Sequence, residues 1–293
     1  MADSFGRHDS LTDRHDANER PVLRICALLP EAETATSILE CAVAGSRGFA
    51  AHIDAVHVGF DPKHSLVSAE ENDLQQLRDI YEGPPEIRAA RVKAAVEAFL
   101  SSATDAPPIA WRDDEGDIGV NVVLESRRAD LIVIGRPIHL DAADALHSAL
   151  FDAHRLVLIA PRDVAAGERT IGRHIVIGWK PGTPAERTAA AALPWLRKAG
   201  KVSVLWVAKA GAAPYGPGAR AFFENLGVSV DITRLERDTR SVGAQLLDEA
   251  IQLGADCLLI GAYRHGELWE SLFGGVTHDV LKRVDLPTFM MRG

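Results

Sequence analysis

The chain has 293 residues, of which 47% are hydrophobic and 25% are charged, and its formal net charge is −9. This length and composition predict a soluble globular protein of two domains, each large enough to bury its own core. The acidic balance argues against a nucleic-acid-binding protein, which would need a basic surface.

The sequence also argues against membrane insertion and secretion. No apolar run approaches the roughly 18 residues that a transmembrane helix needs. Residues 1–20 are polar and charged, so they lack the apolar core of a signal peptide and are expected to form a disordered arm. Cys26, Cys41 and Cys257 form no CxxC pair and are expected to be reduced core residues. We therefore expect a cytoplasmic protein without a metal site.

Strands and helices are predicted to alternate along the first half of the chain. Its predicted elements are a strand at 22–29, a helix at 32–44, a strand at 53–59, helical pieces within 74–100, a strand at 108–111, a helix at 121–128, a strand at 129–135, a helix at 145–152 and a strand at 156–160. The long crossover at 61–106 contains Gly83-Pro84-Pro85, which is expected to break it into two helical pieces.

The same order of elements is predicted in the second half, after a join at 161–173 that is interrupted by Pro, Gly and charged residues. Its predicted elements are a strand at 175–178, a helix at 184–198, a strand at 202–207, a helix at 220–226, a strand at 228–233, a helix at 242–253, a strand at 255–261, a helix from about 276 and a strand at 288–291.

A sequence repeat supports this duplication. Ala129-Asp130-Leu131-Ile132-Val133-Ile134-Gly135 is echoed by Ala255-Asp256-Cys257-Leu258-Leu259-Ile260-Gly261. Continuous apolar runs are typical of parallel strands that are covered on both faces, and the glycine is expected where the backbone turns after the strand. The pattern predicts two α/β domains, at 21–163 and 170–293, each with an open five-stranded parallel sheet and helices on both faces.

Ligands of open α/β sheets bind beyond the carboxyl ends of the strands, so the residues that follow each strand are the candidate site. In the second half these residues are Gly178, Trp179, Lys180, Gly261, Arg264, His265, Gly266, Gly274, Gly275, Val276 and Thr277. The paired glycines before a helix would let an anion approach the free N–H groups of its first turn.

Several of these residues also have a purely structural interpretation. Gly274-Gly275 can form a tight turn, and Arg264 and His265 can be solvated loop residues. Trp179 is expected to pack against a helix rather than to stack on a base.

At this point the second half resembles a known family. The run Gly261-Ala262-Tyr263-Arg264-His265-Gly266, a spacer at 267–273 and Gly274-Gly275-Val276-Thr277 resemble the C-terminal signature of universal stress proteins. The repeat resembles the tandem type of that family, over residues 21–293. The resemblance implies two Rossmann-like domains of the adenine nucleotide α-hydrolase type, with ATP as the implied ligand.

The sequence departs from the motif of the ATP-binding members at three positions. That motif is glycine, two residues, glycine, nine residues, glycine, then serine or threonine, with an aspartate after the first strand. Gly261 and Gly274 match it, whereas Arg264 replaces the second glycine, Gly275 replaces the hydroxyl residue and Lys180 replaces the aspartate. Arg264 either contacts a phosphate or fills its space.

The first half departs further from the motif and is interpreted as a degenerate copy that chiefly supplies structure. No glycine pair precedes its last helix, and Asp141 and Asp144 are expected to repel a phosphate at the matching place. The resemblance also implies that the last strands, 156–160 and 288–291, pair edge to edge within the chain as a pseudo-dimer. Whether two chains form a homodimer is left open.

The leading hypothesis is a stress-response binding or regulatory protein. It would bind ATP, another nucleotide or a small anion in its second half and act through protein partners. One alternative is a nucleotide-hydrolysing or adenylyl-transferring enzyme, with weak ATPase activity at most. The sequence has no GxxxxGK[ST] loop and no nucleophile elbow, and His265 and His278 have no evident partner, so no catalytic residue is assigned. A ligand-free scaffold is the other alternative.

Overall fold

The computed structural model describes residues 22–61, 76–162, 170–180, 183–208, 211, 216–262, 275–283 and 286–292. The predicted N-terminal arm lies outside these residues, and so does most of the predicted join. The domain limits at 163 and 170 therefore remain predictions. No helix within the described ranges combines the length and the apolar character needed to cross a bilayer.

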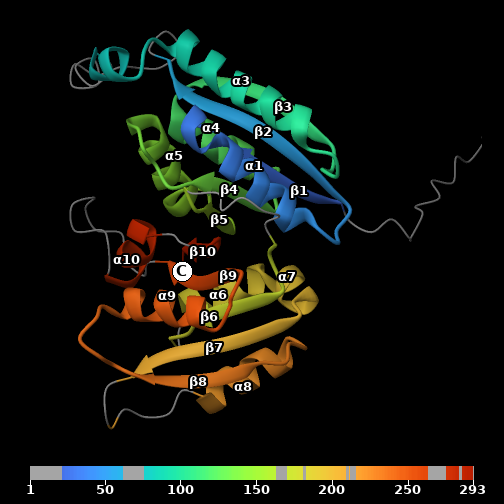
Figure 1. The fold of residues 1–293 in the computed structure, drawn as a ribbon, viewed down its shortest axis with the longest axis vertical. Helices are drawn as coiled ribbons and strands as arrows, with labels where there is room; N and C mark the ends of the chain where they lie inside the picture. The colour runs from blue at the N-terminus through green and yellow to red at the C-terminus, as the bar shows by residue number, and fades with distance from the viewer. Residues whose placement is uncertain are drawn as a thin grey trace, which may run out of the picture.

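The two halves of the chain repeat one order of elements (Figure 1). The first half contains β1 (Leu23–Leu28), α1 (Ala32–Ser46), β2 (Ala51–Phe60), α3 (Pro85–Ser102), β3 (Ile109–Gly116), α4 (Ile118–Ser126), β4 (Leu131–Gly135), α5 (Leu140–Phe151) and β5 (Val157–Ala160). The second half contains β6 (His174–Gly178), α6 (Thr183–Ala191), α7 (Leu193–Lys198), β7 (Lys201–Ala208), α8 (Gly216–Asn225), β8 (Asp231–Glu236), α9 (Val242–Gln252), β9 (Cys257–Ala262), α10 (Gly275–Arg283) and β10 (Thr288–Arg292).

All of these strands lie in one ten-stranded sheet of order β3-β2-β1-β4-β5-β10-β9-β6-β7-β8. Within each half the strands are parallel, as predicted. The halves join where β5 and β10 pair antiparallel, with Leu158 opposite Phe289. The predicted pairing of the last strands within one chain is therefore confirmed, and the two five-stranded sheets form one continuous sheet.

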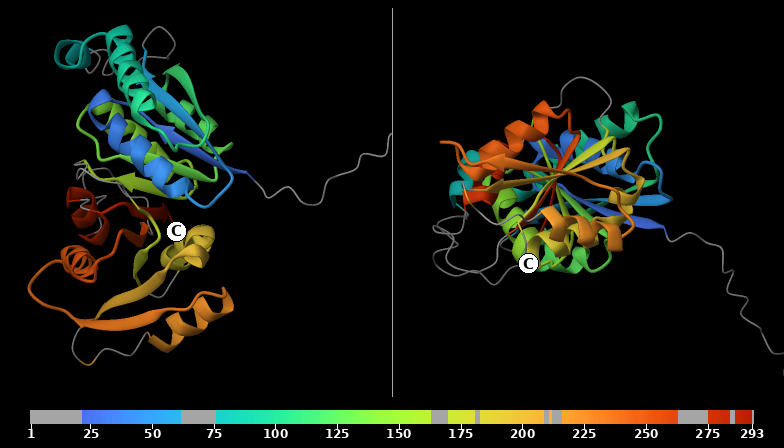
Figure 2. Two further views of the ribbon diagram at one scale, coloured as in Figure 1. Left: turned by 45° about the vertical axis from the view of Figure 1, so that its right-hand side comes forward. Right: turned by 90° about the horizontal axis from the view of Figure 1, so that it is seen from below.

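Helices cover both faces of this sheet, as the two further views show (Figure 2). Alternate residues of β1 divide between two cores: Ile25 and Ala27 face one, whereas Cys26 and Leu28 face the other. The first core is closed by α1, α3, α6, α7 and α8, and the second by α4, α5, α9 and α10. A strand that is buried on both faces needs a continuous apolar run, which explains the sequence pattern.

The aspartate of the sequence repeat has a structural role that is common to both halves. Asp130 accepts a hydrogen bond from the backbone N–H of Arg24 at 2.9 Å, at the start of β1. Asp256 accepts bonds from the backbone N–H groups of 172, 173 and 174, at the start of β6. The acidic residue before each central strand therefore satisfies backbone donors of the neighbouring first strand.

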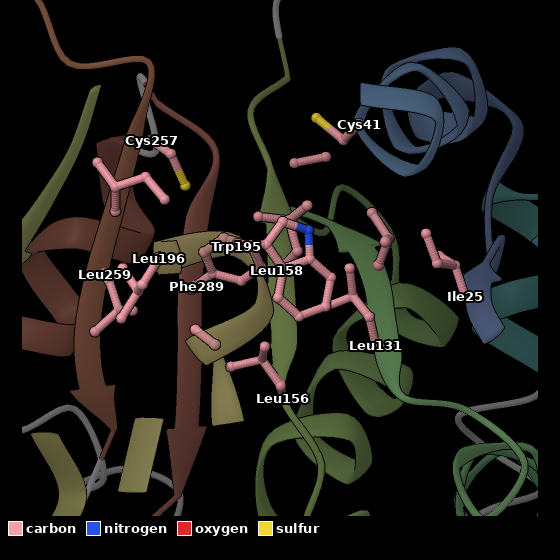
Figure 3. Packing of buried hydrophobic residues seen from close by; sticks show 14 of the residues in the cluster. Ile25, Cys41, Leu131, Leu156, Leu158, Trp195, Leu196, Cys257, Leu259 and Phe289 are labelled. Carbon is pink, nitrogen blue, oxygen red and sulfur yellow. The ribbon is translucent and has the colours of Figure 1, made fainter. Parts of the chain in front are cut away.

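Trp195 of α7 fills the junction between the halves (Figure 3). Its Nε1–H donates to the carbonyl of Gly45 at 2.7 Å, and its ring lies 5.6 Å from Phe49 and 5.3 Å from Phe289. The side chain is only 4% exposed. Because the Gly45 carbonyl and Phe49 come from the first half, Trp195 connects the two halves through a buried hydrogen bond as well as through packing.

Two predicted helices differ from those of the structure. The helix predicted at 184–198 is divided into α6 and α7, because Pro194 lacks the N–H that would continue α6 and instead occupies the first turn of α7. The helix predicted at 145–152 begins at Leu140, so Asp141 and Asp144 lie on α5 and not in a loop before it.

Candidate functional site

The structure brings together the two strand ends of the second half that the sequence singles out. Gly178 ends β6 and pairs with Ile260 of β9, directly before Gly261. Trp179 and Lys180 follow Gly178 at the same edge of the sheet. These residues therefore share the carboxyl end of neighbouring parallel strands, where open α/β sheets bind ligands.

The glycines at this edge are required by close packing. A Cβ atom on Gly261 would lie 2.6 Å from the backbone nitrogen of Ala185 and 2.7 Å from the carbonyl carbon of Pro184, in the first turn of α6. Gly135 has the matching role in the first half, because its Cβ would lie 2.9 Å from Cβ of Thr34 in α1. Neither glycine has a positive φ angle. Gly135 ends β4 as predicted, whereas β9 continues one residue past Gly261 to Ala262. Close approach of a helix explains why both positions are glycine.

Trp179 packs against α8, as predicted. Its ring lies 5.3 Å from the rings of both Phe222 and Phe223, and the residue is 5% exposed. A tryptophan that is buried against two phenylalanines has no free face for a nucleotide base. Trp179 therefore belongs to the packing beneath this edge of the sheet.

Lys180 has the opposite environment. Its side chain is exposed, and it forms no hydrogen bond or ion pair with the part of the chain that the structure describes. An ammonium group has three donors and no acceptor. Lys180 therefore presents, among the described residues, an unpaired positive charge at the carboxyl end of β6.

The remaining predicted residues are described only in part. Arg264, His265, Gly266 and Gly274 lie outside the described residues. The last helix, α10, begins at Gly275, close to the predicted start, and includes Val276, which is half-buried. Thr277 lies in the first turn of α10, but its side chain is outside the description, so its predicted contact with an oxygen atom stays a prediction.

In the first half, the corresponding end of the sheet is occupied by a carboxylate that sequence analysis missed. Glu31 follows β1, is 4% exposed and accepts hydrogen bonds from the backbone N–H groups of Ile138 at 3.1 Å and His139 at 2.9 Å. The hydroxyl of Thr34 donates to it at 3.1 Å. These N–H groups lead into α5, so Glu31 occupies the helix N-terminus where an external anion would otherwise bind.

A second carboxylate completes this arrangement. Glu82 accepts a hydrogen bond from the backbone N–H of Leu140 at 3.3 Å, so three successive N–H groups at the start of α5 are directed at carboxylates of the same chain. The imidazole of His139 lies 3.9 Å from Glu82 and 3.5 Å from Glu33. Burial raises the pKa of Glu31 above its ordinary value, and the hydrogen bonds from His139, Ile138 and Thr34 oppose that shift.

Asp141 and Asp144 are paired with arginines, which sequence analysis did not predict, and their expected repulsion of a phosphate stays a prediction. Nε of Arg78 lies 2.9 Å from Asp141, and its Nη2 lies 2.5 Å from Asp144. Arg88 lies 3.4 Å from Asp141 and donates to the carbonyl of Phe60 at 2.9 Å. These arginines come from 76–81 and α3, so the long crossover of the first half covers the carboxyl end of its sheet. The site is closed by the chain itself.

Comparison with known proteins supports the same fold assignment. The chain matches a universal stress protein from Archaeoglobus fulgidus DSM 4304 with a TM-score of 0.61 and 14% identity, over 92% of this chain and 96% of that one. It matches a candidate universal stress protein from Pseudomonas aeruginosa UCBPP-PA14 with a TM-score of 0.51 and 14% identity, over 92% and 93% of the two chains. A functionally unknown protein from Pseudomonas aeruginosa PAO1 also matches, with a TM-score of 0.51, 13% identity and 92% coverage of both chains.

No protein-family model and no curated protein matches the chain. The structural matches nevertheless extend over both halves within a single polypeptide, which is the arrangement that the sequence repeat predicts. The chain therefore has the fold of the universal stress proteins, present twice in one continuous sheet.

Proposed function

We propose that this chain is a stress-response binding protein that holds a phosphate-bearing ligand at the carboxyl end of its second half. The proposed ligands are ATP and other nucleotides. A protein partner would recognise the ligand-bound form, and the ligand would not be chemically changed. The observation that carries the proposal is the contrast between the halves. Glu31 and Glu82 fill the helix N-terminus of the first half, whereas the exposed cation Lys180 stands at the matching edge of the second.

The chemistry of Lys180 favours the phosphate end of a nucleotide over its base. The amino group of adenine is a donor and needs an acceptor, which an ammonium group cannot supply. Trp179 is buried between Phe222 and Phe223 and offers no stacking face. Recognition would therefore rest on charge-assisted hydrogen bonds to phosphate oxygens and on the N-terminus of α10, with little selection among bases.

Two measurements on the purified chain test this proposal. Denaturing a sample shows whether nucleotide was retained, and calorimetric titration of folded protein that has been freed of nucleotide measures binding. We expect ATP, GTP and tripolyphosphate to bind with similar affinities. Lys180→Gln should weaken all three about tenfold, as the loss of one charge-assisted contact predicts. Lys201→Gln is the matched control, because Lys201 begins β7 at the opposite end of the same sheet and is paired with Asp231.

Two results would contradict the proposal. Strong preference for ATP over GTP and tripolyphosphate would show that the base is read. No binding at millimolar concentrations would favour the ligand-free scaffold. The enzyme alternative is tested separately by phosphate release, and turnover that is lost in Arg264→Ala or His265→Ala would support it.

A further inference from the structure

A cavity of about 480 Å³ lies at the junction between the halves. It is lined from the first half by residues at the starts of β1 and β5 and by Phe49, and from the second half by the end of α6, by α7 and by Met291. Neither Lys180 nor Gly261 lines it, so it is separate from the proposed phosphate site. Its volume lies within the range of small-molecule sites, which occur preferentially between domains.

The walls of this cavity are apolar and held in place by the surrounding fold. Leu156 is 2% exposed and lies directly before β5. Trp195 is fixed by its hydrogen bond to Gly45 and by its ring contact with Phe49. Figure 3 shows Trp195 and Leu156 among the residues that pack the junction. Walls that are already fixed lose little conformational entropy when an apolar ligand enters.

Asp130, His154 and Arg155, which precede the neighbouring strands β4 and β5, supply the charged part of the lining. Arg155 is oriented by two hydrogen bonds at the C-terminal end of α4, from Nε to the carbonyl of Ser126 at 3.1 Å and from Nη2 to that of Arg127 at 3.3 Å. A guanidinium group has five N–H donors, and these two bonds occupy only two of them. Arg155 is therefore an oriented cation that can still donate hydrogen bonds to a ligand. Its planar fork matches the geometry of a carboxylate.

His154 adds a second hydrogen-bond donor to the lining of the cavity, next to Arg155 in the chain. Its φ angle is +50°, and it is the non-glycine residue with a left-handed backbone among those described. That conformation costs on the order of 1 kcal/mol, and such positions cluster at functional sites. The imidazole is exposed and forms no hydrogen bond or ion pair within the described ranges. The carboxylate of Asp130 accepts a hydrogen bond from the backbone N–H of Arg24. This hydrogen bond weakens the repulsion between Asp130 and an anionic ligand.

We propose that this cavity binds a small organic carboxylate, whose apolar body lies against Trp195, Phe49 and Met291 and whose carboxylate pairs with Arg155 and His154. The proposal is independent of the phosphate site. Because both halves line the cavity, a bound carboxylate would also stabilise their junction.

Phenylbutyrate is a suitable probe, with phenylbutanol and phenylbutylamine as neutral and cationic controls of similar shape. Calorimetric titration of the full chain should show saturable binding of the carboxylate, at least about tenfold tighter than of either control. The chain has only three methionines, so methionine-methyl NMR provides a local readout. Met291 lines the cavity, whereas Met290 belongs to the core on the other face of the sheet. The Met291 signal should therefore shift while that of Met290 does not.

Variants separate the wall of the cavity from the charged part of its lining. Ala191→Phe should fill the cavity and abolish binding, and Ala191→Leu provides a smaller change if the first variant folds poorly. Arg155→Gln should remove the preference for the carboxylate, whereas Arg127→Gln, which removes an exposed charge nearby, should not. Failure of the probe to bind, equal binding of acid and alcohol, tighter binding of the amine, or unchanged binding in both Ala191 variants would overturn the proposal.

Discussion

At the residue scale, the two halves differ in the charge that follows their first strand. Glu31 in the first half is buried and accepts backbone hydrogen bonds at the start of α5, whereas Lys180 in the second half is exposed. A helix N-terminus favours negative charge. In the first half the protein itself supplies that charge, whereas in the second half the exposed Lys180 is a cation at the carboxyl end of β6.

Substitution of Glu31 by Gln should reveal this internal anion through the pH dependence of stability. Burial raises the pKa of Glu31 in the folded state above its ordinary value of 4.5, so the folded state binds the proton more tightly than the unfolded state does. The part of the stability that comes from this tighter proton binding is therefore fully present below pH 4.5 and is lost as the pH rises through the folded-state pKa. The backbone hydrogen bonds to Glu31 contribute separately at neutral pH.

Urea unfolding of the wild type and of Glu31→Gln between neutral pH and about pH 4.5 measures this effect. The variant should be less stable at neutral pH by about 1–3 kcal/mol, because one oxygen that accepts backbone hydrogen bonds is replaced by a donor. The difference in stability should widen as the pH falls, since the variant cannot take up the proton. A difference that narrows towards acid would show that the pKa of Glu31 is not raised.

The sequence identified Lys180 as a candidate site residue, but it did not predict that Glu31 accepts hydrogen bonds at the start of α5. The difference has a physical reason. Lys180 could be identified from its place after a strand, which is local information. The partners of Glu31 at the start of α5 lie 107 and 108 residues further along the chain. Only the order of the strands brings them together, so the role of Glu31 could not be read from nearby residues.

At the element scale, the contact between α6 and β9 determines the geometry at the carboxyl end of the second half, where the phosphate site is proposed. Gly261 lets the first turn of α6 approach the strand, and the matching contact between Gly135 and α1 exists in the first half. In both halves, the glycine at the end of the apolar run is therefore explained by a helix that packs closely against the strand. The side chain of Lys180 extends from the loop that joins β6 to this closely packed helix.

Gly261→Ala tests the contact directly. The added Cβ would lie 2.6 Å from the backbone nitrogen of Ala185, so α6 must move away from β9. We expect a loss of about 1–3 kcal/mol in the free energy of unfolding, together with weaker nucleotide binding. Gly218→Ala is the control, because its added Cβ meets nothing within 4 Å, and alanine in a helix should stabilise by up to about 1 kcal/mol. Equal effects of the two variants in chemical unfolding would contradict this account.

The strands were the most predictable elements, and the ends of helices the least. Continuous apolar runs identified β4 and β9, because burial on both faces leaves few alternatives. The start of α5 was predicted five residues late, so that Asp141 and Asp144 were expected to precede the helix. They are accommodated in the helix because Arg78 lies between them, and that arginine is more than 60 residues away in the chain.

At the scale of the whole molecule, the antiparallel pairing of β5 with β10 makes one sheet from the two repeats. The pairing covers the strand edges that separate halves would expose, and such edges promote association. Trp195 adds a buried hydrogen bond and aromatic packing across the same junction. The two halves are therefore expected to unfold together.

Trp195→Ala should weaken this coupling. Loss of the buried ring predicts a decrease of about 3–5 kcal/mol in the free energy of unfolding. Trp195→Phe, which keeps an aromatic ring but loses the bond to Gly45, should cost less. Calorimetric and circular-dichroism melting curves of the wild type should show one coincident transition. Two separate transitions in the wild type would contradict the expectation that the halves unfold as one unit.

If the carboxyl end of the first sheet is closed by its own carboxylates, a phosphate-bearing ligand should bind at the carboxyl end of the sheet only in the second half. Backbone amide NMR of the full chain during titration with ATP tests this claim most directly, because it locates the ligand. The account predicts saturable shifts at Lys180, Gly261, Ala262 and Val276, with none at Glu31, Ile138 or His139. Shifts at the start of α5, or no shifts at the ends of β6 and β9, would contradict it.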